Sequence, residues 1–149
     1  MSLKSVLGFR KHVKDVAREE LDAIVRDLHN RIEDVKRLEG EIGKLLGEIA
    51  RREQEGTEAG DVLALYRYVE ALASSLASGR RRVGVLTAQR DEKQALLLSA
   101  SRDVRTVEIL ETRREDAQAV EEDRREQRAS DAFSLRKWLD GDSHARTEK

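Results

Sequence analysis

Histidines, carboxylates and a glycine–lysine pair are the residues of this chain that could carry out chemistry. The three histidines, His12, His29 and His144, stand far apart, and the chain contains no cysteine. A metal site needs several such ligands held together, and no two of these histidines have the i,i+4 spacing that would place them on one helical face. The sequence therefore predicts no metal site.

Acidic residues are abundant, but nothing in the pattern gathers them into a pocket that could shift the pKa values of an acid–base pair. GEIGKLLG resembles a phosphate-binding loop only superficially, because Leu45 follows Gly43 and Lys44 where Ser or Thr is needed. We expect no enzymatic activity and no cofactor. Gly40, Gly43 and Gly47 share one helical face, which is either a solvated stripe or a groove for a partner's backbone.

The composition favours long helices. Of the 149 residues, 40% are charged and 3% are aromatic, and none is proline. Because proline is the strongest helix breaker, its absence permits very long helices. Few aromatics among many Glu, Arg, Ala and Leu residues are typical of a coiled coil. The absence of cysteine favours an intracellular protein.

Several other classes are disfavoured. The start, MSLKSVLGFRKHVKDV, lacks the unbroken apolar core of a secretory signal, and no apolar run is long enough to span a bilayer. The net charge of −1 gives no long-range attraction to an anionic membrane or to nucleic acid, so no nucleic-acid partner is expected.

The first third of the chain carries a heptad stripe. Its apolar residues alternate between the a and d positions: Leu21, Ile24, Leu28, Val35, Leu38, Ile42, Leu45 and Ile49. Arg31 is the one polar residue among them. Farther upstream, the apolar residues are Val6, Phe9, Val13 and Val16. They stand one residue out of step, which predicts a local adjustment of the supercoil.

A second stripe follows Gly56 and Gly60. Its a positions hold Val62, Val69, Leu76, Val83, Leu97 and Val104, and its d positions hold Leu65, Leu72, Leu86, Ala100 and Val107. Gly79, Arg90 and Lys93 interrupt it. We interpret residues 53–60 as a turn and Asp61 as the N-cap of a second helix. One continuous helix through both glycines is the alternative.

A chain that folds back near residue 56 brings charged residues together across the seam. Arg90 and Lys93 then lie opposite Glu19, Glu20 and Asp22. Opposite charges in a seam fix register and antiparallel sense more than they add stability. The pattern therefore favours an antiparallel hairpin, with a parallel dimer of two long helices as the alternative.

Beyond the reach of the first helix, the sequence becomes polar. Residues 111–128 hold seven acids and five bases, and their only apolar side chains are Ala117, Ala119 and Val120. A helix without a partner is polar all round, as this one is. Large apolar residues then return at Phe133, Leu135, Trp138 and Leu139, in an overhang with no core to enter.

The predicted fold is all-α. Two long helices form an antiparallel coiled-coil hairpin, and the second helix is longer and overhangs the first. One coiled-coil domain covers residues 1–149, with a first helix at about 4–52, the turn at 53–60, a second helix at about 61–139 and a disordered tail at 141–149.

Two features just after the turn are candidate binding surfaces. Tyr66 and Tyr68 fall at the e and g positions, where they either cap the seam or anchor a partner. The run Arg80, Arg81 and Arg82 is either a solvated face or an anchor for an acidic partner surface.

Two segments carry a family resemblance: LALYRYVEALASSLASGRRRV after the turn, and VEILETRREDAQAVEEDRREQRASDAF. Here the chain resembles the FliJ family of flagellar type III export proteins. The resemblance implies a two-helix antiparallel coiled coil, similar to the central stalk of rotary ATPases. Its termini would enter the ring of the export ATPase FliI, its middle would contact the export gate protein FlhA, and it would help to recycle export chaperones. It would lie in the cytoplasm, peripheral at the inner membrane through these protein partners.

The resemblance also implies site residues. The gate-binding stripe of the family falls on Tyr68, Leu72, Ser75 and Gly79. The heptad register places Leu72 and Gly79 at d, partly buried. Either the register is off by one, or the contact uses the open side of the seam. In the overhang, Phe133 and Trp138 are the candidate contacts with the ATPase ring.

Two other functions stay open at this point. The related stalk of the virulence injectisome, the YscO family, has the same shape and role. A structural coiled-coil scaffold without an export role is the third possibility, and it would not bind an export ATPase.

Overall fold

Two helices make up nearly the whole chain. The computed structural model describes the backbone of residues 2–147 and the side chains of residues 2–142. Its elements are α1 (Leu3–Glu55) and α2 (Ala59–Thr147), and the described residues contain no strand. The chain divides into two compact units, one of Arg10–Arg102 and one of Met1–Phe9 with Asp103–Lys149, where a single domain was predicted.

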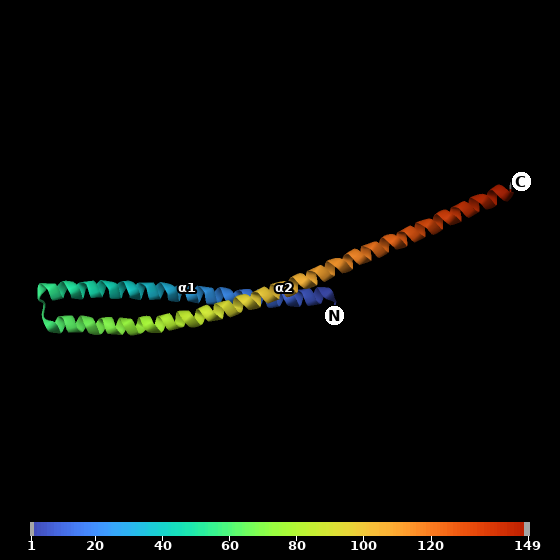
Figure 1. Cartoon of the computed structure of the whole chain (residues 1–149). Coiled ribbons are helices and arrows are strands. Elements are labelled where there is room, and N and C mark those ends of the chain that lie inside the picture. Colours follow the sequence, from blue (N-terminus) through green and yellow to red (C-terminus); the bar gives the residue numbers. More distant parts are fainter. Residues whose placement is uncertain (1, 148–149) are drawn as a thin grey trace. The chain divides into compact units, whose positions relative to one another are not determined.

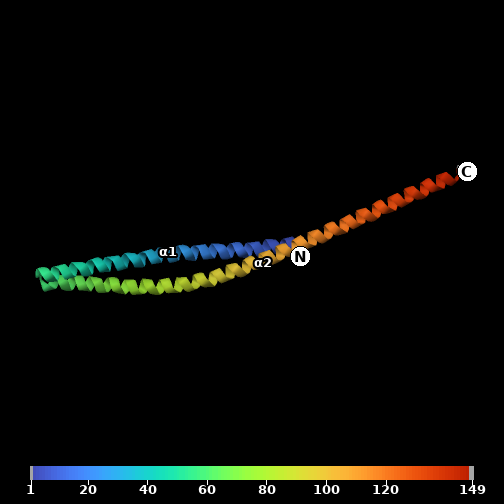
Figure 2. The ribbon, with the colours of Figure 1, turned by 45° about the horizontal axis from the view of Figure 1, so that its top comes forward.

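Within the unit Arg10–Arg102, α1 and α2 lie side by side and antiparallel, as two views show (Figures 1 and 2). The long unbroken helices follow from the absence of proline and from the two heptad stripes. The predicted all-α hairpin, with a second helix longer than the first, is confirmed by the 53 residues of α1 and the 89 of α2.

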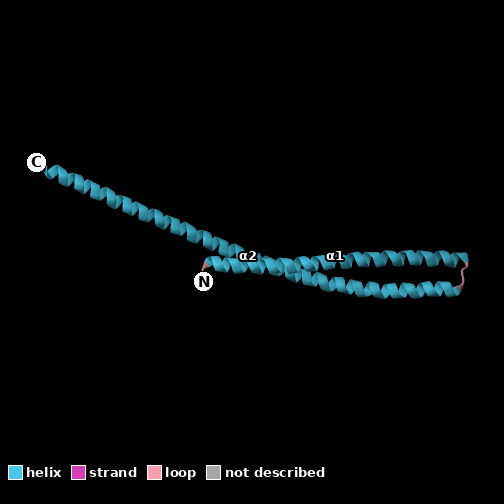
Figure 3. Cartoon of the chain, turned by 180° about the vertical axis from the view of Figure 1, so that it is seen from behind, coloured by secondary structure: helices cyan, strands magenta, loops and turns pink. Residues whose placement is uncertain are grey.

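The turn between the helices is tighter than predicted, and it is the only loop between them in Figure 3. It spans residues 56–58 instead of 53–60. The amide of Thr57 donates a hydrogen bond to the carbonyl of Arg52 (3.1 Å), and the amide of Gly56 donates one to the carbonyl of Glu53 (3.4 Å). This pair of bonds ends a helix on a residue in the left-handed region, and Gly56 has φ 76°.

The start of α2 corrects one prediction. The carbonyl of Glu58 accepts hydrogen bonds from the amides of Asp61 (3.2 Å) and Val62 (3.4 Å), so the helix begins at Ala59 and Asp61 is not its N-cap. Asp61 lies in the first turn, where the helix dipole favours a carboxylate.

The other end of α2 also differs from the prediction. The helix was expected to stop at about residue 139 and to leave a disordered tail at 141–149. Instead it continues to Thr147, and residues 148 and 149 lie outside the described part of the chain. No proline is present to end the helix earlier, and Gly141 alone costs it only about 1 kcal/mol relative to alanine.

The heptad stripes form the seam of the unit Arg10–Arg102. Its most deeply buried residues are Leu28, Ile49, Leu76, Leu86 and Ala100. The register matches the prediction, since Lys93 Nζ lies 2.6 Å from Glu20 Oε2. Arg90, predicted to face the same acids, pairs instead with Asp91 of its own helix at 3.0 Å.

The N-terminal part of this seam overturns another prediction. Val13 and Val16 are each 37% exposed, whereas Lys14 and Ala17 are the half-buried residues. Positions 14 and 17 continue the strict heptad back from Leu21. The heptad register of α1 therefore continues unchanged through this region, and the two valines lie beside the seam. The local adjustment of the supercoil that their spacing predicted does not occur.

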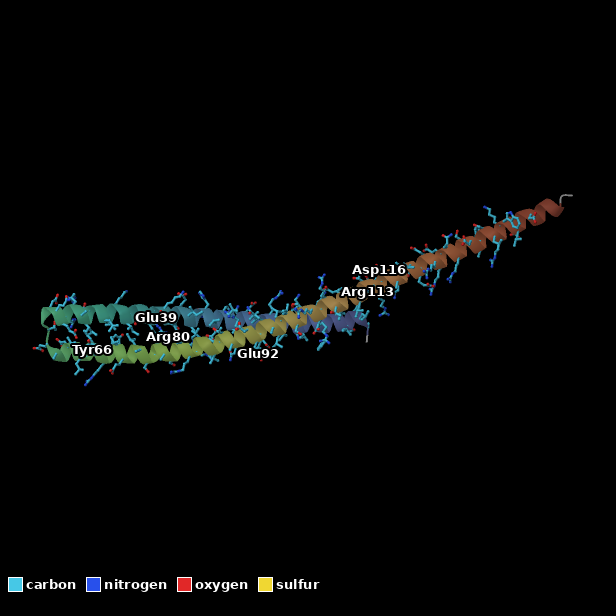
Figure 4. All side chains as sticks on the ribbon, viewed as in Figure 1. Glu39, Tyr66, Arg80, Glu92, Arg113 and Asp116 are labelled. Atoms are coloured by element: carbon cyan, nitrogen blue, oxygen red, sulfur yellow. The ribbon has the colours of Figure 1, made fainter. Side chains whose placement is uncertain are left out.

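In the second unit, the buried residues are Val104 and Val107 of α2. From residue 112 to residue 142, no described side chain of α2 is buried. Charged side chains such as Arg113 and Asp116 project from this segment (Figure 4). Pairs along the helix, such as Arg125 with Glu121 at 3.7 Å, help to hold it, and its residues 112–128 are polar, as is typical of an unpartnered helix.

Candidate functional site

The helix α2 carries its two tyrosines to opposite sides of the seam. Tyr66 and Tyr68 are two residues apart, about 200° around the helix. Their side chains are 43% and 53% exposed, while Leu65 and Val69 beside them are half-buried. The predicted e and g positions of the tyrosines are therefore confirmed.

On one side of the seam, the side chains of the two helices are paired. The Tyr66 hydroxyl donates to Glu53 Oε1 (3.1 Å), and Arg80 Nη2 donates to Glu39 Oε1 (2.9 Å). In Figure 4, Glu39 and Arg80 come from facing helices. The hydrogen bond to the Glu53 carboxylate raises the pKa of Tyr66. We call Glu39, Glu53, Tyr66 and Arg80 the Tyr66 edge.

The other side of the seam is open between Tyr68 and Arg82. Tyr68, Ser75 and Arg82 recur every seven residues and so share one face of α2. The Tyr68 hydroxyl forms no hydrogen bond with any residue that the structure describes. Arg82 Nη2 approaches Asp27 Oδ2 of α1 only to 3.8 Å. We call Asp27, Tyr68, Ser75 and Arg82 the Tyr68 edge.

The four residues predicted to bind the export gate fall into two sets. Tyr68 and Ser75 are exposed, whereas Leu72 and Gly79 are half-buried in the seam. A Cβ atom on Gly79 would lie 3.2 Å from Val35 Cγ2, so the helices approach closely there. The register is therefore as assigned, and only Tyr68 and Ser75 stand free on the surface.

The arginine run is divided among three faces. Successive helical residues are about 100° apart. Arg80 accordingly belongs to the Tyr66 edge and Arg82 to the Tyr68 edge, while Arg81 points outward, exposed, and forms no ion pair within the described residues. The three side chains do not form one common anchor.

The end of α2 presents a separate apolar face, where the sequence predicted Phe133 and Trp138 as contacts with a partner. Phe133 and Trp138 are 68% and 65% exposed. Leu135 and Leu139, exposed by 58% and 51%, share a helical face with Trp138 through their i,i+3 and i,i+4 spacing. Phe133 lies on another side. The i,i+3,i+4 spacing was the signal that would have grouped the two leucines with Trp138.

The described residues offer no metal centre. Nowhere among them do three or more His, Asp or Glu side chains come together as possible ligands, and the side chain of His144 lies outside them. None of the described helical segments is apolar over a length that could cross a bilayer. The site is thus a set of protein surfaces.

Comparison with models of known protein families gives a match over nearly the whole chain. A family model described as "Flagellar FliJ protein" matches residues 1–143, nearly the whole chain. No curated protein and no solved structure matches the chain.

Proposed function

The chain belongs to the FliJ family, and on that premise we propose that it is the stalk that links the flagellar export ATPase to the export gate. Membership makes it a coiled-coil component associated with flagellar export, with a structural and not a catalytic role. The proposal adds the two partners, help to the export chaperones, and a place at the cytoplasmic face of the inner membrane, held there by the partners.

The observation that carries gate binding is the contrast between the two edges. The Tyr66 edge satisfies its hydroxyl and its arginine within the hairpin, whereas the Tyr68 hydroxyl has no partner among the described residues and its side chain is 53% exposed. Tyrosines that are wet when free and buried when docked are typical hot spots of protein interfaces. The open Tyr68 edge therefore supports docking of the gate protein there.

The apolar end of α2 supports the contact with the ATPase. Leu135, Trp138 and Leu139 are large, exposed and on one face, in a segment whose described side chains include no buried one. A partner that covers this face would bury apolar surface, which favours binding by about 25 cal/mol per Å².

An injectisome stalk is disfavoured because the family that matches is flagellar.

A binding assay with the purified cytoplasmic domain of the export gate protein tests the gate contact. Tyr68→Ala should weaken binding about thirtyfold, because loss of a hot-spot side chain commonly costs about 2 kcal/mol. The matched control is Tyr66→Ala, which removes the same ring from the other edge and should bind normally. Normal binding by Tyr68→Ala would show that the tyrosine is not an anchor.

Capture by the export ATPase tests the other contact and separates a stalk from a scaffold. Trp138→Ala should bind the ATPase at least tenfold more weakly, on the scale of about 1.4 kcal/mol per tenfold. Leu98→Ala, equally a large exposed residue (53%) but outside this end of α2, is the control. A wild-type chain that does not bind the ATPase at all would identify a scaffold.

A further inference from the structure

We propose that the Tyr68 edge continues into an acid-binding groove, in which Arg31 and Arg82 hold carboxylates of an acidic segment of the export gate protein. This inference rests on the proposed gate docking, and it adds helix α1 to a contact that the sequence places on α2 alone. It also states the chemistry of the occupant: an apolar or aromatic contact at Tyr68, followed by acidic side chains.

The groove is built by both helices. It is an open hollow of about 430 Å³, lined by Arg31, Asp34, Val35, Arg37, Leu38, Ser75, Ser78, Gly79 and Arg82. Gly79 explains its position, because the seam has no side chain there and only Val35 fills the space from the opposite helix. The groove lies on the side of Ser75 and Arg82, which is the side that Tyr68 occupies two turns earlier.

Three arginines and one carboxylate, that of Asp34, line the groove, so its lining carries an excess of positive charge. Arg31 Nε lies 3.6 Å and Arg82 Nη2 lies 3.8 Å from the two oxygens of one carboxylate, that of Asp27. Both distances exceed those of a good N–H···O hydrogen bond. The two arginine side chains are about half exposed, at 49% and 48%. Two guanidinium groups therefore share one distant carboxylate, whereas Arg37 is satisfied by Glu41 at 3.1 Å.

A carboxylate is the ligand that this arrangement fits. Each guanidinium offers five N–H donors in a planar fork, and a carboxylate accepts two of them in parallel. The hydroxyl groups of Ser75 and Ser78 line the same groove and add donors. An aspartate or glutamate of a partner would neutralise Arg31 and Arg82 more closely than Asp27 does.

A protein segment fits better than a nucleic acid. No aromatic ring lines the groove, so there is no platform on which a base could stack, and the net charge of the chain is −1. Tyr68 and Arg82 are fourteen residues apart on α2, about 21 Å at 1.5 Å per residue. A helix or extended segment of the gate protein that runs along this edge can therefore reach both.

Charge reversal tests the groove, with the purified cytoplasmic domain of the gate protein as the probe. Arg31→Glu and Arg82→Glu should each weaken binding at least tenfold and reduce its dependence on salt. The matched control is Arg81→Glu, whose exposed side chain points away and forms no ion pair within the described residues, so it should bind as the wild type does. Should either reversal unfold the hairpin in circular dichroism, Arg31→Gln and Arg82→Gln replace it.

A variant that binds the gate domain more tightly provides a second test, because an unfolded hairpin would not gain affinity. Asp27→Asn removes the internal carboxylate that competes for both arginines, so it should strengthen binding about threefold or more. If Asp27→Asn instead weakened binding, the arginines would act only through their internal pair, and the inference would be wrong.

The remaining outcomes separate the groove from gate docking itself. Wild-type affinity in both arginine variants, together with loss of binding in Tyr68→Ala, would overturn the groove and leave gate docking intact. A wild-type chain that does not bind the gate domain would overturn both. If single-stranded DNA bound as tightly as the gate domain and with the same loss in Arg82→Glu, the groove would be a nonspecific anion site and the inference would fail.

Discussion

Tyr66 and Tyr68 stand two residues apart on α2, and the structure gives them opposite surroundings. Tyr66 donates a hydrogen bond to Glu53 of α1, and Arg80 on the same edge donates one to Glu39. The Tyr68 hydroxyl has no hydrogen bond within the described residues, and on the same edge Arg82 Nη2 lies 3.8 Å from Asp27 Oδ2. Around Tyr66 the hairpin pairs its own polar groups across the seam, whereas around Tyr68 it leaves them exposed and only loosely paired.

The length of the acidic side chain on α1 accounts for the difference between the two arginines. The Tyr66 edge faces the glutamates Glu39 and Glu53, whose carboxylates reach across to α2. The acid that meets Arg82 is Asp27, which is shorter by one methylene group and only approaches its arginines. The glutamate seven residues before it on the same face, Glu20, does reach Lys93 of α2, at 2.6 Å. An aspartate in place of a glutamate therefore leaves Arg82 less closely paired than Arg80.

The largest expected effect lies beneath both edges, in the seam. Leu86 is 2% exposed, and Leu86→Ala should lower the free energy of unfolding by about 2–5 kcal/mol, since it leaves a cavity in a thin core. Denaturant unfolding followed by circular dichroism measures this. Leu96→Ala, at a side chain that is 50% exposed, should stay within about 0.5 kcal/mol. Equal losses in the two variants would mean that the edges, and not the seam, hold the hairpin together.

Alanine substitutions at two glycines test how closely α1 and α2 approach each other at Gly79, beside the groove. Gly84→Ala should stabilise the hairpin by about 1 kcal/mol, because alanine is the better helix former and the space beyond its Cβ is open. Gly79→Ala should gain clearly less or lose stability, because its Cβ would press against Val35 Cγ2 at 3.2 Å. Thermal unfolding of both variants measures the difference. Equal gains would show that Val35 moves aside freely.

Lengthening one acid should make the two edges alike. In Asp27→Glu the added methylene group should bring the carboxylate within hydrogen-bond distance of Arg82, as Glu39 is of Arg80. Binding of the gate domain should then fall severalfold, while the melting temperature stays constant or rises slightly, since exposed ion pairs contribute about 0–1 kcal/mol. Unchanged gate binding would mean that the openness of this edge does not depend on the length of the acid.

The smallest expected effect is a pH dependence confined to the Tyr66 edge. The hydrogen bond to Glu53 raises the pKa of Tyr66, so the folded hairpin holds the phenol proton more tightly than the unfolded chain does. This stabilisation is complete below the pKa of an unfolded tyrosine, about 10, and is lost as the pH rises through the higher folded value. The melting temperature of the wild type should therefore fall slightly more steeply than that of Tyr66→Phe above about pH 9.

Tyr68→Phe is the control for that measurement, because its hydroxyl has no hydrogen bond to lose within the described residues. It should follow the wild-type melting curve across the same pH range. If Tyr68→Phe and Tyr66→Phe changed the slope equally, the bond between Tyr66 and Glu53 would not be formed in solution.

Local pattern was sufficient to predict the helices, their antiparallel sense and the residues of most of the seam. Heptad spacing, the absence of proline and the glycines near residue 56 depend only on neighbours in the chain. Even the pairing of Lys93 with Glu20 followed from counting residues back from the turn. The prediction was wrong for Val13 and Val16. Their spacing is that of seam residues, but the heptad register of α1 against α2 continues unchanged through this region and leaves both valines exposed.

Tertiary structure alone decided what each edge can do. The sequence places Tyr66 and Tyr68 on the flanks and three arginines in a row, but it does not state which α1 side chains face them. Those neighbours depend on the offset between the helices and on the length of each acidic side chain. Asp27 is one methylene group shorter than Glu39, and the distance from Arg82 to Asp27 is about 1 Å longer than that from Arg80 to Glu39. The groove between Arg31 and Arg82 arises in the same way, because Gly79 and Val35 meet only when α1 and α2 pack.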